Sequence, residues 1–303
     1  MKQRSFASAG IDGLEFAVHG KVTRKAKFLK QMNELMPWKA LCELIEPHYP
    51  KVGNGRPPIG LERMLRLHFL QLWFNLADEA CEEALYDTAV FRGFAMIDLG
   101  RERVPDATTL LRFRRLLEAQ QLADKLFALV NTLLAQQGLK VSEGTMVDAS
   151  IISAPTSTKN STNSRDEQMR PTKKGNNWYF GMKLHIGADT QTGLIHSVAT
   201  TAANVHDSQA LPALLHGGEK RVYGDSAYVG QAHVIEAAAP NALDCTTDRA
   251  FRNKPLTAKQ HMANQIKSRV RALVEHPFYF LKRVWGYGKL RYRGIAKNHN
   301  RLV

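Results

Sequence analysis

The sequence has 303 residues, with 42 lysines and arginines against 28 aspartates and glutamates, giving a formal charge of +14. Its 44% hydrophobic and 23% charged residues are typical of a folded globular protein and exclude a disordered chain. The most apolar stretch, residues 67–77, is interrupted by polar side chains and is shorter than the roughly 18–20 residues of a membrane span. No apolar stretch follows the first basic residues, and the three cysteines are isolated. We therefore expect a cytoplasmic protein with no membrane partner.

Most of the positive charge lies at the C-terminus. Residues 251–303 contain thirteen basic residues and one acidic residue, Glu275, so this last sixth carries +12 and the first 250 residues only +2. Aromatic and apolar residues are interleaved with the cations at helical spacing. A solvated basic tail is one interpretation. The aromatic content favours another, a folded surface that binds a polyanion through its phosphates.

The first half of the chain is predicted to be helical. Apolar residues recur at three- and four-residue steps over residues 27–140, and Asp106 is placed to cap a helix that follows Pro105. Residues 101–115 carry five arginines, Arg112 among them. This segment fits either the DNA-reading helix of a helix-turn-helix or a solvated basic face. We expect a helical N-terminal domain for DNA binding or assembly over residues 1–140.

From Gly144 the pattern changes to short strands separated by turns and helices. Residues 155–177 are dense in Ser, Thr, Asn and Lys and are predicted to form a flexible loop. A helix is predicted to begin at a cap formed by Asp207 or Ser208. The predicted strands lie at 145–147, 179–188, 193–201, 221–225 and 243–245. This order indicates an α/β mixed sheet with helices packed on it, over residues 141–303.

Two of the predicted strands end in an aspartate, Asp148 and Asp225. If these strands are parallel neighbours, both side chains lie at the same edge of the sheet. Adjacent carboxylates repel each other, and oxygen ligands of this kind suit Mg²⁺. Two such ions about 4 Å apart can activate an attacking hydroxyl and neutralise the leaving oxygen of a phosphodiester. Taken singly, either aspartate could also be a turn or cap residue.

The isolated acid Glu275 lies on a predicted helix with Arg271 and Lys282. The spacing i, i+4 and i+11 places the three residues on one face, and Pro277 is expected to kink the helix. Arg271 is expected to hold the Glu275 carboxylate, and Lys282 to reach a phosphate from the same face. A simple salt bridge is the alternative, but it does not explain a single acid among so many cations.

These residues carry a resemblance to a known family. The motifs VDAS around Asp148, YFGMK at 179–183, NVHDS at 204–208 and YGDSAY at 223–228 resemble those of bacterial DDE transposases of the insertion-sequence-five family. The run from Arg271 to Lys282 matches the R-x3-E-x6-K part of the family signature. Ser268 stands where that signature has tyrosine, so the role of the tyrosine is not carried over. The segment from about residue 55 to 139 resembles the N-terminal domain of the family.

The resemblance implies a ribonuclease H-like catalytic domain in which Asp148, Asp225 and Glu275 are the catalytic and metal-binding triad. It implies two Mg²⁺ ions, with Mn²⁺ as a substitute. The implied chemistry is hydrolysis at the transposon ends to free 3′-hydroxyls, which then attack target DNA. Arg271 and Lys282 would orient Glu275 and bind the terminal phosphates. Further DNA contacts are expected at Lys183, which could equally be solvated, and at Arg112, Lys289, Arg291 and Arg293.

The implied partners are double-stranded DNA, as terminal inverted repeats and as target, and a second copy of the chain on that DNA. The implied location is the bacterial cytoplasm, with the nucleoid. Two other functions remain open at this point. One is a metal-dependent nuclease that cuts without strand transfer, and the other is a non-catalytic DNA-binding factor whose acids are structural.

Overall fold

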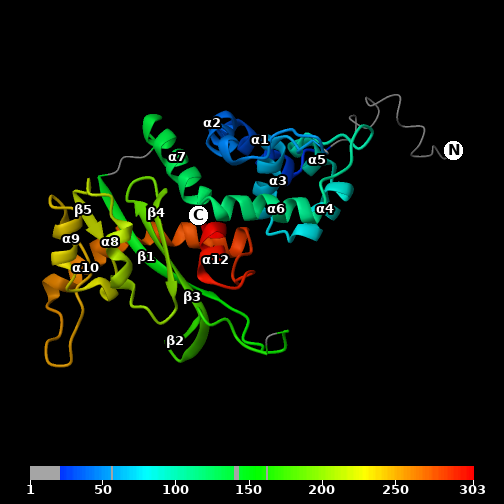
Figure 1. The fold of residues 1–303 in the computed structure, drawn as a ribbon. Coiled ribbons are helices and arrows are strands. Elements are labelled where there is room, and N and C mark those ends of the chain that lie inside the picture. Colours follow the sequence, from blue (N-terminus) through cyan, green and yellow to red (C-terminus); the bar gives the residue numbers. More distant parts are fainter. Residues whose placement is uncertain (1–20, 56, 140–142, 162) are drawn as a thin grey trace, which may run out of the picture.

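The computed structural model describes residues 21–55, 57–139, 143–161 and 163–303, and it begins with a region of helices (Figure 1). Fully buried leucines such as Leu41, Leu65 and Leu70 form the centre of this region. The side chain of Asp106 accepts a hydrogen bond of 2.7 Å from the Thr109 amide, which confirms the predicted cap. The helices are α1 (Arg24–Leu35), α2 (Trp38–Ile45), η2 (Glu46–His48), α3 (Leu61–Trp73), α4 (Asp78–Asp87), α5 (Ala89–Ala95), α6 (Ala107–Ala119) and α7 (Leu122–Gln136).

A six-stranded sheet of order β2-β3-β1-β5-β6 follows, with β4 also paired to β3. The long strand β3 is antiparallel to β1 on one side and to β2 and β4 on the other. In contrast, β5 is parallel to both β1 and β6. The sheet is therefore mixed, and the predicted fold class is confirmed. The strands are β1 (Gly144–Ser153), β2 (Arg170–Lys174), β3 (Asn177–Asp189), β4 (Ile195–Ala202), β5 (Arg221–Tyr223) and β6 (Leu243–Asp244).

Helices cover both faces of the sheet. On one face, Val147 and Val222 pack with Leu211, Tyr228 and Ile235, which come from the segments between β4 and β6. On the other face, Met146 and Ile186 pack with Val274 and Phe278 from the C-terminal helices. The helical elements of this half are η3 (Asp207–Ala210), α8 (Leu211–Leu214), η4 (Ser226–Tyr228), α9 (Ala232–Ala238), α10 (Ala258–Arg271), η5 (Ala272–Val274), α11 (Glu275–Tyr279), η6 (Phe280–Val284) and α12 (Ile295–Leu302).

The C-terminal segment joins the two halves of the molecule. The last helix, α12, lies between the sheet and helices α6 and α7 (Figure 1). His299 contacts Asp124 of α7 at 3.0 Å and Thr200 of β4 at 3.2 Å. Trp285 packs against the core of the helical region. Much of the basic tail is therefore part of the fold and is not a solvated extension.

Three sequence predictions are wrong in detail. The strand predicted to end at Asp148 continues to Ser153, because β1 pairs with β3 along its whole length. The loop predicted over 155–177 contains β2, an exposed polar strand that is held by its backbone bonds to β3 and has no apolar alternation to reveal it. The cap of the helix after β4 is His206, whose ring accepts from the Ser208 amide. No helix among the described residues is long and apolar enough to cross a membrane.

Candidate active site

Asp148 and Asp225 occupy matching positions on β1 and just after β5, two strands that pair in parallel. The pairing of β1 with β5 ends at Met146 and Tyr223, so each aspartate comes two residues after the last paired position. Asp225 lies just beyond its strand and caps η4, where its carboxylate accepts a hydrogen bond of 2.8 Å from the Ala227 amide. Asp148 remains within β1 and accepts 2.7 Å from the Ala149 amide. The two carboxylates are therefore neighbours at one edge of the parallel pair, as predicted.

Glu275 approaches this edge from the helices that cover the sheet. Asp148 shares a sheet face with Met146, because side chains two apart on a strand point the same way, and this face carries the core that includes Val274. Glu275 follows Val274 directly and is solvent-exposed. Burial raises the pKa of Asp148 to about 6, and the negative charges of Glu275 and Asp225 add to the rise. Two acids from distant parts of the sequence thus act on Asp148.

The cationic partner of Asp148 is Arg271. Its Nη1 donates to Asp148 Oδ2 over 3.1 Å, and the guanidinium opposes the rise in the pKa of Asp148. From the sequence, Arg271 was expected to bind the carboxylate of Glu275, four residues along the predicted helix. Instead, no hydrogen bond or ion pair holds the Glu275 carboxylate within the part of the chain that the structure describes. Arg271 stands at the C-terminal end of α10, from which it reaches across to the sheet.

Lys282 is turned inward on the wide helical turn η6, after Pro277. Its ammonium donates 2.6 Å to Ser150 Oγ and 2.8 Å to the Ile151 carbonyl, both on β1. Burial lowers the pKa of Lys282, and the charge of Lys174 adds to this, whereas Glu275 opposes it. Lys282 therefore ties the helix that carries Glu275 to the strand that carries Asp148.

Lys183 lies on the other face of the sheet. In the β1–β3 register it pairs with Ile151, whereas Asp148 pairs with Ile186, so the two side chains point to opposite faces. Its ammonium forms a 2.8 Å ion pair with Asp207 and donates 2.7 Å to the Val205 carbonyl. In this structure it is a half-buried structural lysine.

The other cations expected to contact DNA lie on α6 and on the segment between η6 and α12. Arg112 and Lys289 are exposed, the first on α6 and the second beyond η6. Arg291 donates to the side chain and the carbonyl of Asn75, in the helical region. Arg293 contacts Ser164 and the carbonyl of Arg165. Arg291 and Arg293 are therefore engaged in contacts within the protein.

From the sequence, two residues near the acids, Tyr228 and Asp207, had no expected role at the site. Tyr228 is fully buried, and burial raises its pKa, with the charges of Asp207, Asp148 and Asp225 adding to the rise. Asp207 was expected to be a helix cap, and it is instead the partner of Lys183. Both belong to motifs that carry the resemblance, NVHDS and YGDSAY. Their position in those motifs was the only sequence feature that could have linked them to the site.

Comparison with known protein families decides what this arrangement is. Residues 140–303 match the family model described as "Transposase DDE domain". The chain belongs to the DDE transposase family. Residues 16–116 match a second model, "Transposase domain (DUF772)". The DDE match covers the whole sheet, with Asp148, Asp225 and Glu275 inside it. The predicted family is thus confirmed at this level.

A DDE transposase is an enzyme that cleaves and transfers DNA, and the family generally uses divalent metal ions. The helical region and the mixed sheet with its helices agree with the ribonuclease H-like fold expected for the DDE domain. Among the described residues, no three His, Cys, Asp or Glu side chains are grouped closely enough to form a ready metal site. The guanidinium of Arg271 supplies the positive charge beside Asp148 in this arrangement.

Proposed function

We propose that this DDE transposase cleaves DNA at the ends of its own insertion sequence and joins the freed 3′-hydroxyls to target DNA. Asp148, Asp225 and Glu275 are the proposed catalytic residues. The observation that carries the proposal is the register of β1 and β5, which makes the two aspartates neighbours, together with the charge of Glu275 acting on Asp148. The sequence motifs further support membership of the insertion-sequence-five family.

The donor set fits a divalent metal ion. All three side chains offer carboxylate oxygens, the hard ligands that Mg²⁺ prefers, and Mn²⁺ accepts similar ligands. The raised pKa of Asp148 means that its negative charge is unfavourable here, and a bound cation relieves this. When bound by these carboxylates, a pair of Mg²⁺ ions would activate the attacking oxygen and offset charge on the phosphodiester.

The neighbouring cations position the acids. Arg271 orients Asp148 through the 3.1 Å contact, and Lys282 fixes the distance between β1 and the helix of Glu275 through its two bonds. We propose direct phosphate contacts for the exposed Arg112 and Lys289, and not for Lys183. A homodimer on DNA follows from the need to bring two ends together.

We propose two functional units, residues 1–140 and 141–303. The two family matches, 16–116 and 140–303, support this division. The first unit would recognise the transposon ends or assemble the complex. The second would carry out the chemistry, with its C-terminal helices holding Glu275 over the sheet.

The test uses full-length protein, Mg²⁺ and a duplex that carries the DNA flanking the reading frame. Asp148→Asn, Asp225→Asn and Glu275→Gln are each expected to abolish nicking and joining while DNA binding is kept. Glu236→Gln, an exposed change on α9, is the matched control and is expected to keep full activity. Normal cutting by any one of the three active-site variants would show that the triad is wrong.

The same reaction separates the alternative functions. Joined products are expected for a transposase, nicks alone would indicate a nuclease without strand transfer, and binding without scission would indicate a non-catalytic factor. Short inverted repeats just outside the reading frame are the expected genomic counterpart. Sedimentation of the protein with the end duplex tests the proposed dimer.

A further inference from the structure

A loop leaves the sheet directly beside the proposed active site. It connects β6 to α10 and begins with two backbone bonds to the strand that leads to Asp225. The Cys245 amide donates 2.8 Å to the Val222 carbonyl, and the Thr247 amide donates 3.0 Å to the Gly224 carbonyl. Gly224 is the residue before Asp225. The start of the loop is therefore fixed next to a proposed catalytic carboxylate.

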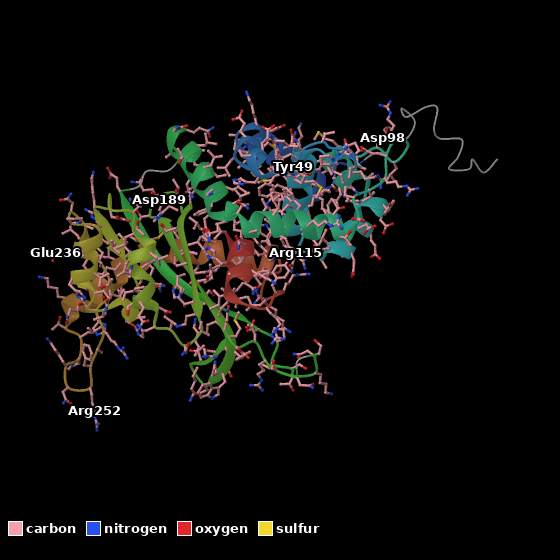
Figure 2. The ribbon with its side chains drawn as sticks, viewed as in Figure 1. Tyr49, Asp98, Arg115, Asp189, Glu236 and Arg252 are labelled. Carbon is pink, nitrogen blue, oxygen red and sulfur yellow. The ribbon has the colours of Figure 1, made fainter. Side chains whose placement is uncertain are left out.

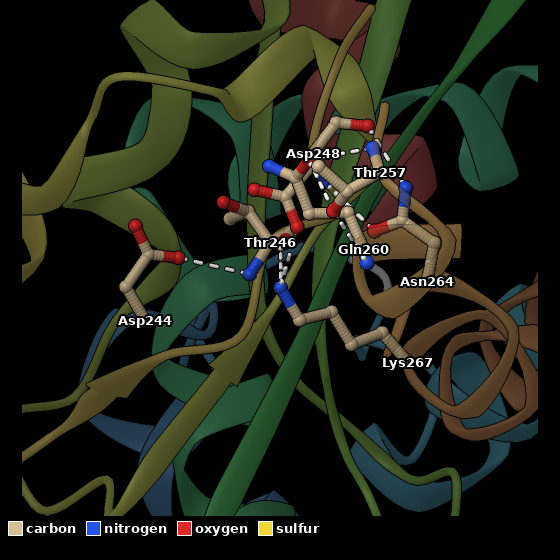
Figure 3. Close-up of polar contacts among 7 residues, drawn as sticks. All are labelled: Asp244, Thr246, Asp248, Thr257, Gln260, Asn264 and Lys267. Carbon is tan, nitrogen blue, oxygen red and sulfur yellow. Dashed lines mark hydrogen bonds and ion pairs between the residues drawn. The ribbon is translucent and has the colours of Figure 1, made fainter. Parts of the chain in front are cut away.

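The base of the loop is tied to α10 by a network of polar contacts (Figure 3). Asn264 accepts 2.9 Å from the Asp248 amide and donates 3.0 Å to the Asp248 carbonyl. Lys267 donates 2.7 Å to the Thr246 carbonyl and contacts Asp248 Oδ2 at 3.4 Å. On the returning side, Thr257 and Gln260 form a capping box that starts α10. Both arms of the loop are thus held by the helix that also carries Arg271.

Beyond this base the chain forms a narrow projection, residues 249–254, which we call the finger. Its tip is a tight turn in which Phe251 and Lys254 exchange backbone hydrogen bonds of 3.1 and 3.0 Å. All six residues are exposed, and Arg252 lies at the far end of the projection, away from the body of the protein (Figure 2). Backbone hydrogen bonds hold the turn at the tip, and the polar contacts with α10 hold the base.

The finger carries an unbalanced charge. Arg249, Arg252 and Lys254 have no hydrogen bond or ion pair from their side chains within the described residues. No acidic residue occurs between Asp248, which is engaged at the base, and Glu275. Between the cations, the Phe251 side chain is 59% exposed. Cations around an exposed apolar ring match a phosphate backbone with a groove, where arginines bind phosphates and apolar side chains enter between base steps.

A second copy of the chain is a poorer occupant for this surface. One phenylalanine supplies little apolar area compared with the roughly 800 Å² per partner of a stable interface. A partner of this chain would also have to offer an acidic patch, and the body of the chain carries only +2 over its first 250 residues. DNA supplies both the charge and the groove.

We propose that the finger grips duplex DNA beside the phosphate that is cleaved: Arg249, Arg252 and Lys254 bind backbone phosphates and Phe251 enters the groove. The position beside the cleaved phosphate rests on the proposed catalytic role of Asp225, whereas the DNA contact itself does not.

The first test measures binding of the full-length protein to a fluorescent duplex of the flanking DNA, in EDTA, at several salt concentrations. Replacing Arg249, Arg252 and Lys254 together by Gln is expected to reduce the slope of log affinity against log salt by roughly 3, about 1 for each lost phosphate contact. The matched control, R249K with R252K, keeps the charges and is expected to keep the slope. Because EDTA prevents cleavage, this result does not depend on the catalytic triad.

The second test replaces Phe251 by photoreactive p-benzoylphenylalanine and compares it with the same replacement at Leu35, an exposed residue of α1. Illumination is expected to attach DNA at position 251, several-fold more than at position 35. An unchanged salt slope in the triple variant would overturn the proposal. So would cross-linking of position 251 to a second protein chain. If the triad proposal is wrong and Asp148→Asn still cleaves DNA, the salt dependence of binding still tests the finger. If the finger proposal is wrong, cleavage still tests the triad, so each proposal can fail without the other.

Discussion

Arg271 reaches Asp148 from a helix 123 residues further along the chain, and it provides the charge that allows this buried aspartate to ionise. The 3.1 Å contact only partly offsets burial and the two neighbouring acids, because the pKa of Asp148 is still raised to about 6. In the absence of metal, the proposed active site therefore holds a carboxylate whose ionisation opposes folding.

Because the charge of Asp148 is only partly compensated, Asp148→Asn is expected to stabilise the metal-free protein. The unfolded Asp148 ionises near pH 3.8 and the folded one near pH 6, so the folded state binds the extra proton between these values. Stability is then lost as the pH rises from about 4 to 6, by at most about 3 kcal/mol. Urea unfolding in EDTA at pH 7.5 is expected to show the variant more stable by about 1–3 kcal/mol, with the difference gone at pH 4. A variant that is less stable at pH 7.5 would show that Arg271 fully compensates the charge.

Lys282 is expected to act mainly as a structural tie. Lys282→Met keeps the aliphatic stem but leaves Ser150 Oγ and the Ile151 carbonyl without their donor. Unsatisfied groups of this kind cost about 1–3 kcal/mol, which urea unfolding can measure. The neighbouring Arg283 is exposed, so Arg283→Met is the matched control and is expected to change stability by less than about 0.5 kcal/mol. Unchanged stability with weaker DNA binding in Lys282→Met would instead place this lysine on a phosphate.

The pair of aspartates was predictable because their environment is local. Each follows a short run of apolar residues in a β pattern, and parallel strands bring such positions to one edge. Glu275 drew attention as the one acid in the last 53 residues, and its place in the proposed triad came from the family resemblance. The helical region was predictable for a similar reason, since its apolar residues recur at the helical period over several turns.

The positions of the cations were not predictable, because they depend on register and on distant packing. If the register of β3 against β1 shifted by a single residue, Lys183 would lie on the other face of the sheet. No local sequence pattern fixes this register. Arg271 has a carboxylate four residues away on its own helix, yet it bonds one on the sheet. The register itself depends on Gly181, where a Cβ would come within 2.1 Å of the Ile152 carbonyl oxygen. A sequence pattern shows this glycine but not the strand that approaches it.

Asn75 is expected to hold the helical region against the C-terminal segment. Its backbone is left-handed, with φ 51°, and its side chain accepts from Arg291 and Arg301 and donates 3.0 Å to the Gly286 carbonyl. Asn75→Gly tolerates the backbone and removes the side-chain bonds, so we expect a loss of about 1–3 kcal/mol. Asn75→Ala is expected to lose about 1 kcal/mol more, because a Cβ disfavours this conformation.

A double-mutant cycle with Arg291→Ala checks that the Asn75 effect comes from this contact. Because Arg291 and Asn75 bond each other, the double variant Asn75→Gly, Arg291→Ala is expected to be more stable than the sum of the single losses predicts. Strict additivity in urea unfolding would contradict the contact between the two halves of the molecule.

Tyr228 combines complete burial with a hydroxyl that has no hydrogen-bond partner within the described chain. Tyr228→Phe keeps the packing against Val147 and Ile235 and removes an unsatisfied polar group. We therefore expect the free energy of unfolding to stay the same or rise by up to about 1 kcal/mol, whereas Tyr228→Ala should lose about 3–5 kcal/mol through the cavity it leaves. DNA nicking by Tyr228→Phe is expected at the normal rate. If that variant folds normally but nicks slowly, the Tyr228 hydroxyl takes part in the reaction, because packing alone does not distinguish phenylalanine from tyrosine at this position.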